Sequence, residues 1–184
     1  MGRLIVTERV TLDGVFDATS MAEWDFPFHS PARMAFIASG IHESDAYLLG
    51  RVTYEMLAPG WSAMKNNEEG IADKLNSMTK YVVSSTLREA LWNNSTILPG
   101  DPVEEVRRVK ERSGQNILVH GSGMLVRALL QAGLVDELQL LVHPSIQGAG
   151  KKLFHDGSHT ALELIDTQLL AHGVLALRYG PKVG

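Results

Sequence analysis

The sequence predicts an α/β fold, with a mostly parallel mixed sheet, helices on both faces and a C-terminal antiparallel hairpin. Three observations lead to this prediction. Short segments rich in Val, Ile and Leu alternate with helix-like segments in the order β-α-β-α-β-β-α-β-α-β. Two of the strand-like segments run directly into glycines that open a helix. The last two strand-like segments are separated only by residues 171–173, which predicts a hairpin and so an antiparallel edge.

Each element follows from local composition. The predicted strands, rich in β-branched and apolar residues, cover residues 3–12, 45–50, 80–84, 96–98, 116–120, 135–143, 162–170 and 174–179. The predicted helices cover residues 31–41, 51–57, 68–78, 102–113 and 124–132.

Helix boundaries have recognisable signals. Ser30 before Pro31 is typical of a helix start, because serine caps the first N–H groups and proline fits the first turn. Asp101-Pro102 with Glu104 forms a similar start. The pair at 59–60, Pro-Gly, is expected to end the second helix. Residues 13–29 are expected to form a long loop, and loops of this length are more often functional than idle.

Size and composition limit the function classes. The chain has 184 residues, a net charge of −4 and no cysteine. We expect one domain over residues 1–184. The negative charge disfavours a general nucleic-acid binder, and the lack of cysteine excludes disulfides and thiolate chemistry. No apolar run approaches the ~20 residues of a membrane span, and the N-terminus lacks the pattern of a signal peptide. We therefore expect a cytoplasmic protein that acts on a small molecule, without a nucleic-acid or membrane partner.

Three predicted strand ends carry groups that suit a phosphate. In an open α/β sheet these ends meet at one edge, where ligands bind. A helix N-terminus offers free N–H groups and the positive end of a dipole, and glycine lets the backbone approach a ligand closely. The candidate residues are Gly50, Arg51, Thr53, Ser84, Ser85, Gly121, Ser122 and Gly123.

Each segment by itself has a simpler interpretation. Gly121 and Gly123 could make an ordinary tight turn, Arg51 could be a surface side chain, and the serines could end a strand. The turn at 121–123 is neither a full dinucleotide-binding fingerprint, since Val126 replaces the third glycine, nor a nucleophile elbow, since His120 and Met124 stand where glycines are needed. The agreement of three strand ends favours a nucleotide site.

The same segments resemble a known family. GRVTYE at 50–55, SST at 84–86 and HGSG at 120–123, in this order and spacing, resemble the dihydrofolate reductase fold. VTLDGVF at 10–16 and PSIQGAGKKLF at 144–154 resemble more closely the reductase domain of the bifunctional riboflavin-biosynthesis deaminase–reductase and its stand-alone bacterial relatives. The resemblance covers nearly the whole chain and implies a dihydrofolate-reductase-like three-layer sandwich.

The resemblance also implies a cofactor, NADPH, and a place for each of its parts. Arg51 would lie near the ribose 2′-phosphate, with Gly50 and Thr53 at the phosphates, and Ser84 and Ser85 along the adenosine. The turn at 121–123 would hold the pyrophosphate. Three residues would border the nicotinamide, namely Asp13, Gly14 and Val15. Residues 24–29 would face the substrate, and a loop with Gly148 and Gly150 would close the site. The family also implies a homodimer, for which the stripe of Leu138, Leu140 and Val142 or the final hairpin could supply the interface.

The expected function is an NADPH-dependent reductase that transfers a hydride to a small C=O or C=N substrate of pyrimidine or pterin type. Asp25 and His29 are the candidate proton donors in the aromatic loop. Dihydrofolate itself is not expected as substrate, because His29 stands where folate reductases carry an acid after the Trp-x-x-Pro-x pattern. The alternatives are a non-catalytic NADP(H)-binding protein, a true dihydrofolate reductase and, least favoured, a hydrolase that uses Ser122. No metal is expected, although His155 and His159 flank a glycine-bearing loop.

Overall fold

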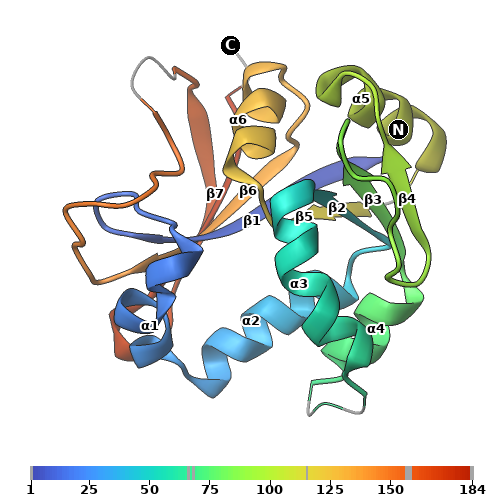
Figure 1. Ribbon diagram of the computed structural model, residues 1–184. Helices are drawn as coiled ribbons and strands as arrows, with labels where there is room; N and C mark the ends of the chain where they lie inside the picture. The colour runs from blue at the N-terminus through green and yellow to red at the C-terminus, as the bar shows by residue number, and fades with distance from the viewer. Residues whose placement is uncertain (1, 66, 68, 115, 156–158, 183–184) are drawn as a thin grey trace.

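A single sheet runs through the centre of the molecule (Figure 1). The computed structural model describes residues 2–182 apart from 66, 68, 115 and 156–158. Within these residues the sheet has eight strands in the order β4-β3-β2-β5-β1-β6-β8-β7. In chain order they are β1 (Arg3–Thr11), β2 (Ala46–Gly50), β3 (Thr79–Val83), β4 (Ser95–Leu98), β5 (Asn116–Val119), β6 (Glu137–His143), β7 (Leu162–Leu169) and β8 (Leu175–Pro181).

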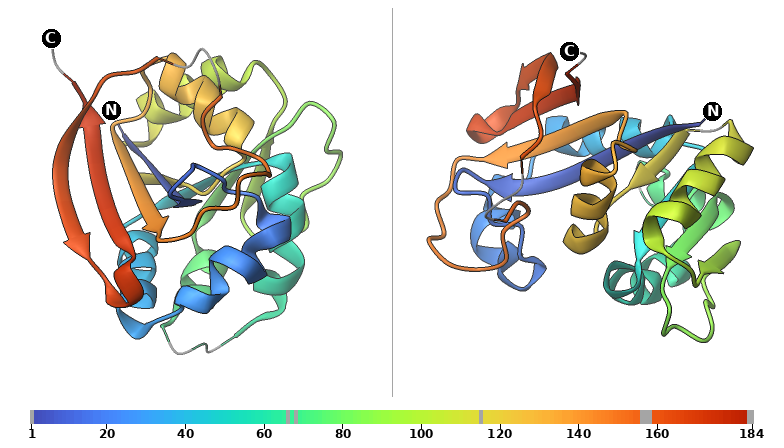
Figure 2. Two further views of the ribbon diagram at one scale, coloured as in Figure 1. Left: turned by 90° about the vertical axis from the view of Figure 1, so that its left-hand side faces the viewer. Right: turned by 90° about the horizontal axis from the view of Figure 1, so that it is seen from above.

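The first six strands are parallel, and the final hairpin is antiparallel to its neighbour. β1 pairs in parallel with both β5 and β6, while β8 pairs antiparallel with β6 and with β7. Figure 2 shows this hairpin at the outer edge of the sheet. The predicted mixed sheet with an antiparallel edge is therefore confirmed.

Helices pack on both faces of the sheet. The longer helices are α2 (Pro31–His42), α3 (Arg51–Ala63), α4 (Ile71–Ser77), α5 (Pro102–Ser113) and α6 (Gly123–Gln131). Buried residues of α5 and α6 share one core cluster with Leu4 and Val119, while those of α2, α3 and α4 share another with Tyr47 and Leu118. Neighbours along a strand point to opposite faces, so Leu118 and Val119 belong to different clusters. The result is the predicted three-layer arrangement, with α5 and α6 above the sheet and α2 to α4 below it in Figure 1.

Two predictions about individual elements were wrong. The second helix does not end at Pro59, because α3 continues to Ala63. Proline lacks a backbone N–H, so it removes one helical hydrogen bond, and its ring crowds the preceding turn. Here Trp61 packs against the core, and the Asn76 side-chain amide donates to the carbonyl oxygens of Trp61 and Met64. Tertiary contacts therefore keep the last turn helical.

The predicted long loop over 13–29 contains three short helical turns, η1 (Ala18–Ser20), α1 (Met21–Trp24) and η2 (Phe26–Phe28). Trp24 is buried, and its indole N–H donates to Ser20 Oγ at 3.1 Å. These turns fold the aromatic segment back onto the sheet. The remaining strands and helices begin and end within three residues of their predicted bounds.

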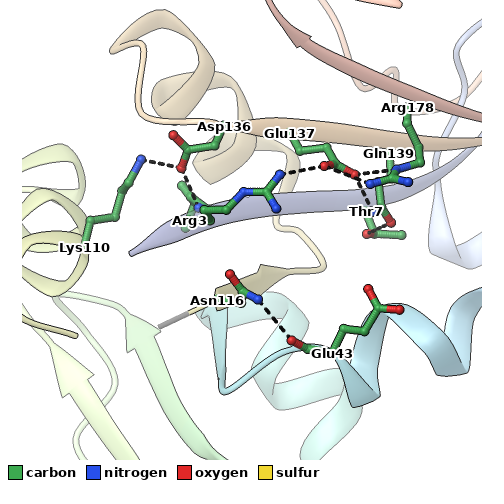
Figure 3. Close-up of polar contacts among 10 residues, drawn as sticks. Arg3, Thr7, Glu43, Lys110, Asn116, Asp136, Glu137, Gln139 and Arg178 are labelled. Atoms are coloured by element: carbon green, nitrogen blue, oxygen red, sulfur yellow. Dashed lines mark hydrogen bonds and ion pairs between the residues drawn. The ribbon is translucent and has the colours of Figure 1, made fainter. Parts of the chain in front are cut away.

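A buried carboxylate joins β1, β6 and β8 (Figure 3). Glu137 accepts hydrogen bonds from Arg3 at 2.9 Å, from Arg178 at 2.7 Å and from Gln139 at 2.8 Å. Gln139 in turn accepts from Thr7 at 3.0 Å. Burial alone raises the pKa of Glu137, but the hydrogen bonds from Arg178 and Gln139 outweigh burial, and the pKa lies below its ordinary value. The pairing of the central strands with the hairpin therefore rests on an ionised group.

A second polar contact fixes α5 to the sheet. Lys110 Nζ lies 2.6 Å from Asp136 Oδ2 and donates to the carbonyl oxygen of Leu134 at 2.7 Å. Asp136 also accepts from the backbone N–H of Leu4 at 2.6 Å.

None of the helices in the described part of the chain is both long and apolar enough to cross a membrane.

Candidate active site

The early end of β5 opens a cavity at the carboxyl edge of the sheet. Val119, its last residue, lies opposite Val6 of β1 and Leu48 of β2. β1 continues to Thr11, whereas the chain after β5 leaves the sheet and enters α6. The space between β1 and β2 opens into a cavity of about 240 Å³. Its apolar wall includes Met21, Trp24, Met34, Ile37, Ile41, Met56, Leu57, Trp61, Ile71, Leu75 and Leu141.

The two glycine turns predicted to bind phosphate lie against each other beside this cavity. The N–H of Gly50 donates to the carbonyl oxygen of Gly121 at 3.3 Å. A Cβ on Gly50 would lie 2.5 Å from Ser122 Oγ, and one on Gly121 would lie 2.9 Å from Thr53 Oγ1. A Cβ on Gly123 would overlap the ring of Phe16. The structure therefore brings these predicted residues together, and the close approach requires glycine.

The helices that start at these turns differ from α2 and α5 in their capping. Ser30 caps α2 by accepting from the N–H of Arg33, and Asp101 caps α5 by accepting from two N–H groups. Neither Gly50 at α3 nor Ser122 at α6 makes a side-chain cap. The first N–H groups of α3 and α6 therefore point out of the helix ends without a side-chain acceptor. Such an end is suited to an anion.

The predicted adenosine side lies next to α3. β3 pairs with β2 so that Val83 is opposite Gly50, which puts Ser84 and Ser85 beside the start of α3. Arg51 is exposed and pairs with Glu55, one turn on, at 2.7 Å. Ser84 Oγ accepts from the N–H groups that follow it at 86 and 87, so this hydroxyl shapes the turn. Ser85 is exposed.

The loop expected at the nicotinamide is held to the glycine loop expected to close the site. Asp13 accepts hydrogen bonds from the backbone N–H groups of Gln147 and Gly148. The hydrogen bond from Thr11 has the largest effect on the pKa of Asp13 and, together with these two, lowers it to about 2. Figure 1 shows the two loops side by side. Val15 is buried and bridges to Lys152, and neither it nor Gly14 lines the cavity. Phe16, the residue after Val15, does line the cavity.

The glycines of the second loop have the backbone expected of a tight turn. Gly148 and Gly150 have φ values of 70° and 118°, a region that side chains rarely adopt. Gly150 lies over Val15, where a Cβ would approach within 3.0 Å of a methyl group. The loop therefore rests on residues 14–17 and supports one wall of the cavity.

The two predicted proton donors have different positions. Asp25 is fully buried, 2.6 Å from Arg33 Nη1, 3.2 Å from His143 Nε2 and 3.3 Å from Arg9 Nη1. Burial alone raises the pKa of Asp25, but His143 and the two arginines outweigh burial and lower it. His29 is exposed, and neither residue lines the cavity. Asp25 reaches the cavity through Arg9, which lines it.

Sequence analysis missed five polar residues of the cavity, Thr7, Glu8, Arg9, Tyr47 and His120. Tyr47 Oη lies 2.9 Å from His120 Nδ1. Burial lowers the pKa of His120 to about 3 and, with the charge of Glu8, raises that of Tyr47. Glu8 and Tyr47 lie inside strands, where no short motif marks them. The position of His120 directly after a buried strand was the one available signal.

Metal ligands do not gather in the described part of the chain. No three His, Asp or Glu side chains there lie close enough to hold a metal ion. The residues between His155 and His159, at 156–158, lie outside the described residues.

Known proteins resemble the chain in sequence and in structure. The uncharacterised protein YyaP of Bacillus subtilis (strain 168) is 30% identical, and the alignment covers 96% of this chain and 94% of that protein. A putative riboflavin biosynthesis protein from Shewanella sp. PV-4 superimposes with a TM-score of 0.77 at 20% identity, over 98% of this chain and 99% of that one.

Two further solved structures share the fold. A pyrimidine reductase-like protein from Corynebacterium diphtheriae matches with a TM-score of 0.73 at 14% identity, over 100% of this chain and 93% of that one. Dihydrofolate reductase from Enterococcus faecalis, in complex with NADP(H), matches with a TM-score of 0.66 at 15% identity, over 99% of this chain and 98% of that one. The fold is therefore dihydrofolate-reductase-like. The sequence model of the RibD C-terminal domain family matches residues 3–176, and the chain belongs to this family of reductase domains.

Proposed function

We propose that this protein is an NADPH-dependent reductase that acts on a small C=O or C=N compound of pyrimidine or pterin type. One observation carries the proposal. Two helices without side-chain caps begin at glycine turns that touch each other, directly beside a largely apolar cavity. An anionic cofactor fits the helix ends, and a flat ring fits the cavity.

The residues present fit the cofactor that the family implies. A Cβ on Gly121 or Gly123 would meet Thr53 or Phe16, so these glycines let the turn pack closely. The N–H groups at the start of α6 have no side-chain cap and suit a pyrophosphate. Gly50 and Thr53 continue this surface, and Arg51 supplies a cation for a 2′-phosphate. Bound NADPH supplies a hydride, while the protein supplies orientation and electrostatics. The homologous fold in the E. faecalis enzyme, described in complex with NADP(H), supports this assignment.

The cavity suits a planar, partly polar substrate. Its wall is mainly Met, Leu, Ile and Trp, and such side chains exclude water and pack on the faces of a ring. Arg9 lines it and bonds Asp25 through Nη1, which leaves other N–H groups of the guanidinium for ring carbonyls. The name of the C. diphtheriae relative, a pyrimidine reductase-like protein, supports the same substrate class. The alternatives are a non-catalytic NADP(H)-binding protein and a true dihydrofolate reductase.

Asp25→Asn should lower the free energy of unfolding by about 3 kcal/mol at neutral pH, because it leaves the buried guanidinium of Arg33 without its counter-charge. The pKa of Asp25 is lowered in the folded protein, so its stabilisation is present above the ordinary carboxyl pKa of about 4 and is lost as the pH falls below it. Urea unfolding at several pH values measures both effects. His29→Asn, an exposed control, should change stability by less than about 0.5 kcal/mol. Equal free energies of unfolding for wild type and Asp25→Asn would show that the ion pairs of Asp25 do not stabilise the fold.

The protein should bind NADPH more tightly than NADH. A charge-assisted hydrogen bond is worth ~1.5–3 kcal/mol, so Arg51→Ala should weaken NADPH binding roughly tenfold to a hundredfold and leave NADH binding unchanged. Fluorescence titration with both nucleotides measures this. Arg107→Ala is a matched control, since Arg107 is as exposed as Arg51 and pairs with Glu104 on its own helix. Equal affinities of wild type for the two nucleotides would contradict the assignment.

The loss of NADPH absorbance tests the substrate class. The panel consists of pyrimidine and pterin compounds that carry a C=O or C=N group. We expect at least one to reach the usual enzymic kcat/KM of ~10⁴ M⁻¹s⁻¹ or more, and dihydrofolate to fall far below it. The reason is that His29, where the folate-reductase pattern has an acid, is exposed, while Asp25 is already engaged by Arg33 and His143. Rapid reduction of dihydrofolate would make the protein a folate reductase. Tight NADPH binding without turnover would favour the non-catalytic alternative.

We also propose that the protein is a homodimer that pairs through the outer hairpin. Of the stripe considered from the sequence, Leu138 is buried in the protein's own core and is unavailable. Leu164, Leu169 and Leu175 of β7 and β8 are 51%, 71% and 37% exposed, and such an apolar edge is suited to a second copy. Light scattering should give a dimer mass for wild type and for the control Leu91→Glu, and a monomer mass for Leu169→Glu. A monomeric wild type at micromolar concentration would end this proposal.

A further inference from the structure

The cavity holds one buried carboxyl group that forms no ion pair among the described residues. Glu8 lies on β1, is 8% exposed and lines the cavity. Its Oε1 atom is buried, and no described residue gives it a hydrogen-bond partner. A buried polar atom without a partner costs free energy, so such a group in a native protein calls for an explanation.

The groups around Glu8 do not neutralise a negative charge. The backbone N–H of Gly121 and the charge of Arg9, which is already paired with Asp25, favour ionisation, but burial outweighs both and raises the pKa of Glu8 to about 8. The other titratable groups of the cavity are Tyr47 and His120, which are uncharged at neutral pH and bond each other. Glu8 is therefore mostly a neutral carboxylic acid near pH 7, and an acid needs an acceptor for its proton.

We propose that Glu8 is the proton donor of the reductase, acting directly on the heteroatom of the substrate's C=O or C=N group. This inference rests on the proposed function. The substrate carbon receives the hydride, and the electron pair of the double bond moves to the heteroatom. The heteroatom takes the proton from Glu8, which is left as a carboxylate. Glu8 regains a proton from water when the product leaves, so the cycle closes.

The other candidate donors are less suited to this step. Asp25 is ionised and surrounded by Arg9, Arg33 and His143, so it has no proton to give. His29 is exposed and does not line the cavity. His120 is uncharged at neutral pH because burial lowers its pKa to about 3. Glu8 alone of these residues both lines the cavity and carries an acidic proton.

The first test needs neither cofactor nor substrate. Infrared difference spectra between wild type and Glu8→Gln, recorded from pH 5 to pH 10, report the carboxylic-acid carbonyl of Glu8. We expect it to be protonated at pH 7 and to ionise with a midpoint near 8. The Gln variant keeps the shape and neutrality of the side chain, so it should fold, and Glu163→Gln on the exposed edge strand is the control. A midpoint below about 6 would overturn the proposal.

The second test uses the substrate found in the panel. For wild type, kcat/KM should fall as the pH rises above about 8, since the donor is then ionised. In Glu8→Gln this high-pH decline should vanish and kcat should drop by about a hundredfold, within the usual range for a general acid. Glu8→Asp should keep the decline with a smaller loss. NADPH affinity should be unchanged in both variants.

The outcomes separate the two proposals. Equal kcat/KM values for wild type and Glu8→Gln would overturn the role of Glu8 and leave the reductase intact. Weakened NADPH binding in Glu8→Gln would instead make Glu8 part of the cofactor site and would also overturn it. A wild type that binds NADPH but reduces no compound would end the proposed function and with it the donor role, while the infrared midpoint would still establish the protonation state of Glu8.

Discussion

The contact between the turns after β2 and β5 is the constraint on which the rest of the site depends. Gly50 and Gly121 approach so closely that a methyl group on either would meet Ser122 or Thr53. This approach is possible because β5 is short and its chain turns away where β1 continues. The same early end creates the cavity and aims the starts of α3 and α6 at one place. Backbone geometry thus sets the position of both the uncapped helix starts and the pocket.

Two buried carboxyl groups near the cavity show how environment decides charge. Asp25 lies beside two arginines and His143, which stabilise its ionised form against the cost of burial. Glu8 has weaker compensation and remains protonated. Groups of the same chemistry can thus take opposite roles, one holding Arg9 in the wall and the other carrying a proton. Arg9 is the link between them, since it pairs with Asp25 and lines the cavity with Glu8.

The outer hairpin has a different relation to the core. β8 is joined to the central strands through Arg178 and Glu137, an interaction that spans three strands (Figure 3). Its partner β7 is largely exposed and carries Leu164 and Leu169 on the edge of the sheet. The hairpin is therefore firmly attached on one side and apolar on the other, which is the arrangement of a surface available for association.

Much of the fold could be predicted from the sequence, because strands, helices and turns depend on near neighbours. Ser30-Pro31, Asp101-Pro102 and the residues at 171–173 act within a few positions of themselves, and these elements have nearly the predicted bounds. The glycine turns were also visible, since a strand, two glycines and a helix follow one another directly. The extension of α3 past Pro59 was not visible, because it depends on the packing of Trp61 and on a hydrogen bond from Asn76.

The sequence by itself determined the order of elements, the parallel sheet with its hairpin and the glycines that meet beside the cavity. Only the tertiary structure decided which polar groups lie in that cavity and in which state of charge. The pKa values of Asp25 and Glu8 depend first on burial. They depend next on His143 for Asp25 and on Gly121 for Glu8, and both of these residues are distant in the chain. Desolvation and charge pairing act through space, so no local pattern of residues reveals them.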